Sequence, residues 1–153
     1  MWVPPEETDP VVLHAPTRQS VAVFGAVRPA DGHRVVDRAN PFNTDSFRSF
    51  LQHLLRHRCP TRQMVVIVDN AKYHHAKALA PWLSRHHDVL RLDYLPPHSP
   101  DLNQQERVWK VTRRLVTHNE YFAQLEPLIA AVLRQFALWD RPNAILHKLC
   151  ALI

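Results

Sequence analysis

Four short stretches of the chain have the apolar pattern of β-strands. Residues 18–28 are apolar on both faces, and residues 33–38 follow them after the turn sequence PADG at positions 29–32. This arrangement predicts an antiparallel hairpin with a well-buried first strand. Met64–Val68 is a continuous β-branched run, which is typical of a central strand covered on both faces, and residues 89–95 alternate between apolar and polar.

Longer stretches carry apolar residues every three or four positions, which predicts helices. The first runs from a cap at Asn43 or Thr44 to about residue 57, and a short one covers about residues 75–86, limited by Pro81. Two more are expected from Ser99 or Asp101 to about residue 117 and over about residues 119–139. A hairpin followed by alternating strands and helices predicts an α/β fold with a mixed sheet.

The length of 153 residues and the 46% hydrophobic content predict one domain spanning residues 1–153. The two cysteines lie far apart, which excludes a disulfide-stapled scaffold and a cysteine-based zinc ribbon. No apolar run approaches the roughly 20 residues of a membrane span, and residues 1–10 are too polar for a signal peptide. Only two glycines are present, so a glycine-rich phosphate loop is excluded.

The charge balance favours an anionic partner. Lys and Arg total 19 against 14 Asp and Glu, which gives a formal net charge of +5. Most of these cations are arginines, whose planar guanidinium suits phosphate. Nucleic acid is therefore the expected class of partner.

Two acidic residues occupy positions where carboxylates could bind a metal ion. Asp69 follows the predicted strand Met64–Val68 at its carboxyl end, where α/β proteins form ligand sites. Glu106 lies early in the helix after the proline-rich loop, and the two carboxylates converge if that helix packs across the sheet. Carboxylates of this kind bind Mg²⁺, and paired metals serve phosphodiester chemistry. From spacing alone the alternative stays open that Asp69 opens a turn and Glu106 pairs with Lys110.

Two longer segments carry a family resemblance. VDNAKYH at residues 68–74 resembles the "DNA-x-x-H" segment of mariner-like transposases, and YLPPHSPDLNQQERVWK at residues 94–110 resembles their "LPPYSPDLNPIExxW" segment. Both occur in the family's order, each at a strand exit or a helix start. FGAV at residues 24–27 and the His-Asn pair at 118–119 are similar to the bacterial insertion-sequence branch.

The resemblance implies a ribonuclease-H-like catalytic domain of the DDE type, with a mixed sheet flanked by helices. It implies that Asp69 is the second acid of the triad and Glu106 the third, and that both hold Mg²⁺, for which Mn²⁺ can substitute. In the family's reaction, water cleaves the transposon end and the freed 3′-hydroxyl attacks target DNA. The implied partner is double-stranded DNA, and the implied location is the bacterial cytoplasm, at the nucleoid.

The family's first acid and the first, central strand that bears it have no counterpart in this sequence. The N-terminal MWVP resembles a segment that follows this strand, so we expect the strand to lie upstream of Met1. Glu7 and Asp9, in a proline-rich stretch, are poor substitutes. Two strand edges would then face a gap, which residues 11–14, a second copy of the chain or a complementing upstream transposase chain could fill. We expect the chain alone to have impaired activity or none.

Several residues near the two acids are candidates for supporting roles. Asn70, His74 and Asn103 match the motif segments and could support the site, although turn and capping roles are equally consistent for the two asparagines. A zinc site at His74 and His75 lacks further ligands at a usual spacing. The residues that could contact DNA phosphate, or could simply form a solvated face, are Lys72, Arg107, Lys110 and Arg114.

Two further interpretations stay open. The first is a non-catalytic DNA-binding or assembly fragment of a split transposase, for which Mg²⁺ binding through Glu106 would be irrelevant. The second is a related nuclease of the ribonuclease-H fold with another substrate. The PDLN helix start at residues 100–103 favours the transposase branch over this second interpretation.

Overall fold

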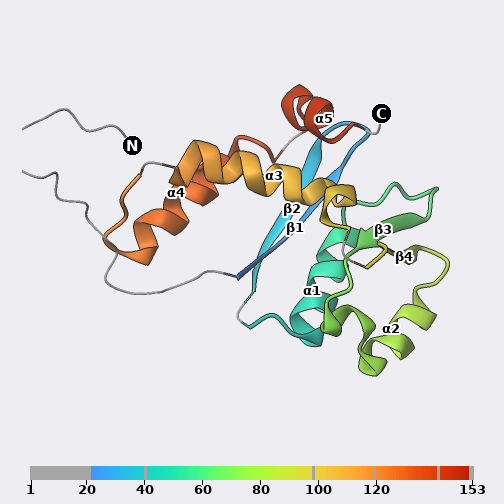
Figure 1. The fold of residues 1–153 in the computed structure, drawn as a ribbon. Helices are drawn as coiled ribbons and strands as arrows, with labels where there is room; N and C mark the ends of the chain where they lie inside the picture. Colours follow the sequence, from blue (N-terminus) through green and yellow to red (C-terminus); the bar gives the residue numbers. More distant parts are fainter. Residues whose placement is uncertain (1–21, 40, 98, 119, 141, 152–153) are drawn as a thin grey trace, which may run out of the picture.

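The structure is a computed structural model, and it describes residues 22–39, 41–97, 99–118, 120–140 and 142–151. A β-hairpin crosses the middle of the molecule (Figure 1). Strand β1 (Ala22–Arg28) pairs antiparallel with β2 (His33–Ala39), as predicted. The turn between them needs Gly32, whose φ of 71° is in the left-handed region. The predictions for residues 1–21 lie outside the described residues.

A second sheet contains β3 (Met64–Val68) and β4 (Leu90–Tyr94), which run parallel. The described strands form these two separate pairs, and β1 and β3 do not pair with each other. The prediction that β3 is covered on both faces is wrong, since Val65 is 44% and Ile67 62% exposed. The other face of β3 packs on the core, and the exposed face borders the cavity described below. These small sheets with flanking helices are compatible with a ribonuclease-H-like fold.

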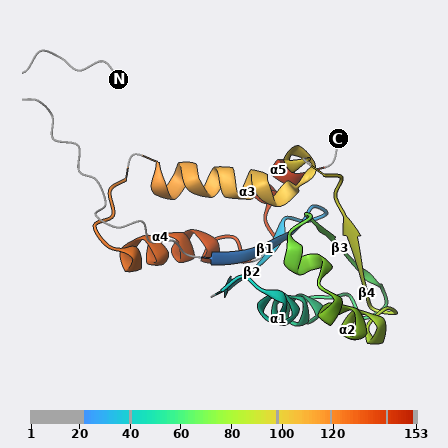
Figure 2. The same cartoon turned by 60° about the horizontal axis from the view of Figure 1, so that its bottom comes forward.

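Helix α1 (Thr44–Leu55) lies against one side of both sheets (Figure 2). Asn43 caps it, because its side chain accepts a hydrogen bond from the backbone N–H of Ser46, and the Ser46 hydroxyl in turn accepts from the Asn43 N–H. The predicted apolar stripe is confirmed, with four side chains buried: Phe47, Phe50, Leu51 and Leu54.

The segment predicted as one helix over residues 75–86 is divided into three short pieces. Two 3₁₀ turns, Lys72–His75 and Lys77–Leu79, precede α2 (Ala80–Arg85). Pro81 lies in the first turn of α2, where its missing N–H costs no hydrogen bond. The proline therefore begins the helix instead of kinking its middle.

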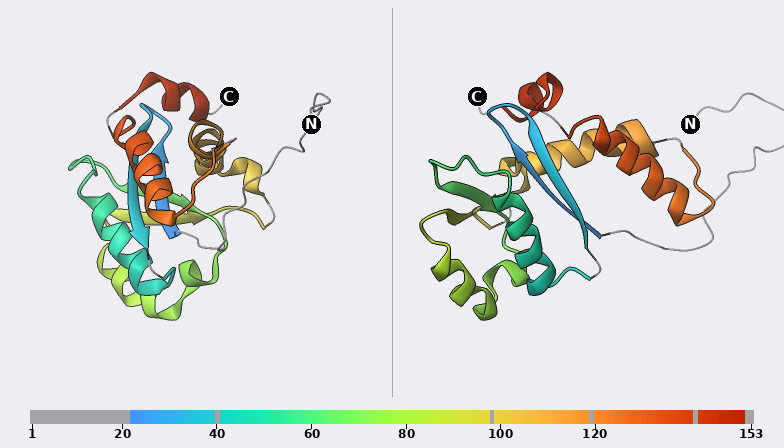
Figure 3. Two further views of the ribbon diagram at one scale, coloured as in Figure 1. Left: turned by 90° about the vertical axis from the view of Figure 1, so that its left-hand side faces the viewer. Right: turned by 180° about the vertical axis from the view of Figure 1, so that it is seen from behind.

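Three helices cover the other side of the hairpin (Figure 3). Helix α3 (Gln104–Thr112) continues into a π-helical turn over Arg113–Thr117, α4 spans Leu125–Ala137, and α5 spans Ala144–Cys150. The predicted start of α3 was too early, because a separate 3₁₀ turn occupies Pro100–Leu102 and Asn103 caps the helix. The described part of α4 is also shorter than predicted, and α5 was not predicted.

The hairpin has a hydrophobic core on each of its faces. Phe24 and Val35 pack with α1, β3 and β4 on one face, where Leu51 is fully buried. Val23, Val27 and Val36 face the second core, whose buried residues are Val108, Phe136, Trp139, Leu146 and Cys150. This alternation explains why the sequence of β1 is apolar at nearly every position.

Candidate functional site

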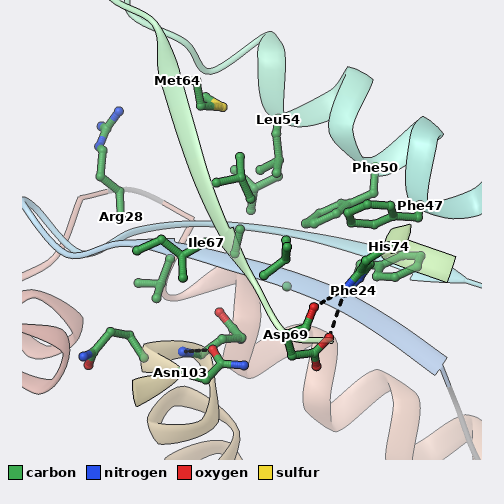
Figure 4. A pocket seen from close by; sticks show the side chains of 18 of the residues that line it. Phe24, Arg28, Phe47, Phe50, Leu54, Met64, Ile67, Asp69, His74 and Asn103 are labelled. Carbon is green, nitrogen blue, oxygen red and sulfur yellow. Dashed lines mark hydrogen bonds and ion pairs between the residues drawn. The ribbon is translucent and has the colours of Figure 1, made fainter. Parts of the chain in front are cut away.

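A cavity of about 350 Å³ lies between the two sheets. Residues 23–28 of β1 and the whole of β3 line it, with the phenylalanines of α1 on one side and the start of α3 on another. One end is polar, where Asp69, His74 and Asn103 contribute to the lining (Figure 4). The first motif, after β3, and the second, at the start of α3, therefore meet at this cavity.

Asp69 lies directly after β3, with its carboxylate 58% exposed. Its Oδ1 accepts a hydrogen bond from the backbone N–H of Ala71 at 3.1 Å and lies 3.0 Å from Nδ1 of His74. The backbone carbonyl of Asp69 also accepts from that Nδ1 at 2.9 Å. Because both partners are acceptors, Nδ1 of His74 carries the proton. The carboxylate is thus fixed in direction while its outer surface is open to a cation.

His74 is buried, packed against Phe47 with a ring separation of 4.2 Å. Burial lowers the pKa of His74 below its ordinary value, and the adjacent Asp69 only partly opposes this. The imidazole is therefore held neutral at physiological pH, where it acts as a hydrogen-bond donor that positions Asp69. The predicted supporting role of His74 is consistent with this geometry.

Asn70 connects the exits of the two parallel strands. Its Nδ2 donates to the carbonyl of Leu95 at 2.6 Å, and its Oδ1 lies 3.1 Å from Nε2 of His75. The Tyr94 hydroxyl, which donates to the carbonyl of His74 at 3.0 Å, adds a second connection. Asn70 thus joins the segments that carry the two motifs.

At the start of α3, the polar side chains of Asn103, Gln104 and Gln105 border the cavity. Asn103 caps the helix by accepting from the N–H of Gln105 at 3.1 Å. Gln105 is only 9% exposed, and within the described residues neither its Nε2 nor its Oε1 has a hydrogen-bond partner. A buried amide in this state is costly unless something supplies its hydrogen bonds. The sequence signal that could have identified this amide is a polar residue within the apolar stripe of the helix, between Leu102 and Trp109.

Glu106 lines a second cavity, of about 490 Å³, which shares Trp109 of α3 with the first. Arg38 and Arg113 share that lining with apolar residues of α4. Asp69 contributes to the first cavity and Glu106 to the second, so the lining residues do not bring the two carboxylates together. Successive residues of an α-helix differ by about 100° in direction, which is why Gln105 and Glu106 face different sides. Convergence of the two acids stays a prediction.

The four predicted DNA contacts differ in what they do in the structure. Lys72, Lys110 and Arg114 are exposed. Arg107 is partly buried, and its Nη1 donates to the carbonyl of Leu149 at 3.2 Å, so it ties α3 to α5. The first three are available for phosphate, whereas Arg107 already has a structural partner.

The donor set at the polar end suits a hard cation in type, because carboxylate and amide oxygens are what Mg²⁺ prefers. Among the described residues, no group of three or more His, Cys, Asp and Glu side chains has the arrangement of a metal site. The two predicted ligands, Asp69 and Glu106, line different cavities, and among the described residues no third acid completes a group with them.

The candidate site therefore combines an α/β fold with an acid, Asp69, directly after a strand. The family model described as "DDE superfamily endonuclease" matches residues 1–129, and the chain belongs to this family. The membership indicates a transposase-like nuclease whose substrate is DNA, and such nucleases generally use divalent metals. The chain is also similar to the "Uncharacterized protein y4pE/y4sA" of Sinorhizobium fredii (strain NBRC 101917 / NGR234), with 30% identity over 108 residues, which cover 70% of this chain and 76% of that protein.

None of the helices in the described ranges combines the length and the apolar character needed to cross a bilayer.

Proposed function

We propose that this chain is part of the catalytic domain of a DDE transposase of the bacterial insertion-sequence type, acting on DNA at the nucleoid. The observation that carries the proposal is Asp69, which is held at the carboxyl end of β3 by His74 and Ala71 with its carboxylate exposed. The helix that contains Glu106 begins beside the same cavity. These are the positions that the two family motifs assign to acids of the triad.

In the proposed reaction, Asp69 and Glu106 would hold Mg²⁺ or Mn²⁺. The bound metal would supply activation of the attacking oxygen and stabilisation of the leaving one. The protein's own part is to fix the Asp69 carboxylate through His74, to cap α3 with Asn103, and to offer Lys72, Lys110 and Arg114 to DNA phosphates. Water cleaves the transposon end first, and the released 3′-hydroxyl then attacks target DNA.

We further propose that the catalytic domain is incomplete in the described residues, because its first acid and first strand are supplied from elsewhere. In support of this, β1 and β3 each pair on one edge only among the described strands, and a cavity separates them. The amide of Gln105, which has no hydrogen-bond partner among the described residues, faces the same space. An added strand would pair with the free edges of β1 and β3 and provide backbone groups for hydrogen bonding with Gln105.

The test is cleavage of the DNA that flanks the coding region, with and without Mg²⁺. We expect the 153-residue chain alone to cut weakly or not at all, and addition of the polypeptide encoded immediately upstream to produce metal-dependent cutting. Asp69→Asn and Glu106→Gln should each reduce that cutting by roughly 10²-fold or more, because each removes charge that holds the metal. Robust cutting by the chain alone that is lost in Asp69→Asn would show that the site is complete without a partner.

One alternative is a non-catalytic DNA-binding or assembly fragment, and it is consistent with Asp69 and Glu106 lining different cavities. In that case DNA binding should weaken when Lys110 and Arg114 are replaced by alanine and should fall as salt rises. Mg²⁺ binding separates the two functions: Glu106→Gln should weaken it if the chain is catalytic and should leave it unchanged if the chain only binds DNA.

A further inference from the structure

Three histidines and one aspartate form a continuous chain of contacts at the end of the cavity opposite Asp69. His53 belongs to α1, His57 lies in the turn after it, and His33 and Asp37 belong to β2. Neither family motif includes these residues. His33 and His57 also contribute to the lining of the cavity between the sheets.

The hydrogen bonds of this chain determine where the ring protons lie. Nδ1 of His53 is 2.8 Å and 2.9 Å from the two carboxylate oxygens of Asp37. A carboxylate accepts, so Nδ1 of His53 carries a proton and, in the neutral ring, Nε2 carries a lone pair. That lone pair lies on the side of Nε2 of His57, at 3.4 Å.

The second ring has a comparable arrangement. Nδ1 of His57 lies 3.3 Å from Nε2 of His33, so His57 can donate through Nδ1 and leave its own Nε2 unprotonated. In this tautomer two Nε2 lone pairs face each other at 3.4 Å, whereas in the other tautomer the Nε2–H of His57 donates to Nε2 of His53. Two lone pairs at this separation repel unless a proton or a cation lies between them.

The separation matches that of two ligands on one metal ion. Nitrogens bound at 2.0–2.1 Å to a tetrahedral Zn²⁺ are about 3.4 Å apart. Metal-bound histidines commonly donate the other ring N–H to a carboxylate or similar acceptor, as His53 does to Asp37. The alternative pair, His33 with His57, lacks this support, because the Nδ1 of His33 is buried without a partner among the described residues.

We propose that His53 and His57 form a binding site for a borderline transition-metal ion of the Zn²⁺ class, supported by Asp37 and His33. The bound ion takes Nε2 of each ring, and water completes its coordination. Imidazole nitrogen selects Zn²⁺, Co²⁺, Ni²⁺ or Cu²⁺ over Mg²⁺, which prefers oxygen. This site is therefore separate from the proposed catalytic ion and does not depend on the proposed function.

The charges around the pair set the conditions for binding. Burial, together with His33, His53, Arg28 and Arg56, lowers the pKa of His57. The two arginines oppose the binding of a dication beside the ring. Arg28 is partly neutralised by Asp31, which lies 2.6 Å from it, and Asp37 offsets part of the remaining charge.

The experiment uses the 153-residue chain without an affinity tag, titrated with Zn²⁺ or Co²⁺ alone at pH 7.5. We expect one ion per chain, with changes in the ring NMR signals of His53 and His57. His53→Gln and His57→Gln should each weaken binding at least tenfold, and Asp37→Asn should weaken it by about 10–100-fold, because it removes the carboxylate that orients His53.

The matched control is His87→Gln. His87 also contacts a carboxylate, Asp88 at 2.9 Å, but none of its contacts in the described residues involves a second imidazole. This variant should bind like the parent chain. The proposal is overturned if the parent chain binds no ion, or if binding is unchanged in both His53→Gln and His57→Gln. Because the NMR signals are read on the parent chain, a variant that fails to fold still leaves the proposal open to refutation.

Discussion

His74 shows how burial and hydrogen bonding together define a residue near the candidate site. Its Nδ1 donates to Asp69, its ring packs against Phe47 and Tyr73, and its backbone carbonyl accepts from Tyr94. The match to the family motif predicted that His74 supports the site. The sequence could not predict that the ring is buried, because its burial depends on Phe47 of α1, which is distant in the chain.

The lowered pKa of His74 predicts a pH dependence of stability. Since protons bind the unfolded state at higher pH than the folded state, stability should be complete above about pH 6.5 and fall as pH decreases below that value. His74→Gln should lower the free energy of unfolding by about 1–3 kcal/mol at pH 7.5, because it removes a buried hydrogen-bonded ring. The difference in the free energy of unfolding between the parent chain and His74→Gln should shrink toward pH 5.5, because the parent chain is itself destabilised there.

Urea unfolding at pH 7.5, 6.5 and 5.5 would check this prediction. His74→Gln should keep part of the dependence of the free energy of unfolding on pH, because burial and neighbouring cations also lower the pKa of His57. The double variant His74→Gln/His57→Gln should have a weaker pH dependence of the free energy of unfolding than His74→Gln alone. If the parent chain is equally stable at all three pH values, His74 is not held neutral by folding.

At the scale of elements, the hairpin turn and α5 depend on each other. The N–H of Asn143 donates to the carbonyl of Asp31 at 3.0 Å, and His147 Nδ1 lies 2.8 Å from the carbonyl of Pro29. A Cβ added at Gly32 would contact the Asn143 carbonyl and lie 2.5 Å from the N–H nitrogen of His147. Glycine is therefore required here both by the positive φ and by the close approach of α5.

Gly32→Ala should lower the free energy of unfolding by about 2–4 kcal/mol, because it combines an unfavourable left-handed alanine with displacement of the start of α5. The matched change Ala30→Gly, in the same turn, should cost about 1 kcal/mol or less. Chemical denaturation would compare the two, and hydrogen exchange would show faster exchange in α5 of Gly32→Ala. Equal stability of the two variants would contradict the predicted contact.

Elements with strong local signals were predicted from the sequence, and those that depend on distant contacts were not. The hairpin, α1, β3 and β4 follow from periodicity and from local features such as the cap at Asn43. Helix α5 has only seven residues, too few for a clear periodicity, and it is positioned by the distant hairpin turn. The bounds of α3 also differ, because a cap at Asn103 could not be distinguished locally from one at Ser99 or Asp101.

At the scale of the whole molecule, the sequence predicted the strands but not how they are shared between sheets. A β-branched run such as β3 has the same pattern whether it is covered on one face or on two, since coverage depends on what lies beside it. The same limit applies to the candidate site. The sequence predicted Asp69 at a strand exit, whereas the rotation of α3, which directs Glu106 into the second cavity, depends on packing against β1, α4 and α5.

The exposed face of β3 allows a last prediction about complementation. Ile67 is 62% exposed on the side of the cavity, so Ile67→Lys should change the free energy of unfolding of the chain alone by no more than about 0.5 kcal/mol. If a strand from an upstream polypeptide covers this face, the buried lysine would be unpaired and would prevent its binding. Leu138→Lys is the matched control, because Leu138 is 74% exposed after α4 and does not line the cavity. Ile67→Lys should no longer co-purify with the upstream polypeptide, and the DNA cleavage that the complex performs should be lost. Leu138→Lys should retain both properties. If Ile67→Lys also retains both, the complementing strand does not contact this face of β3.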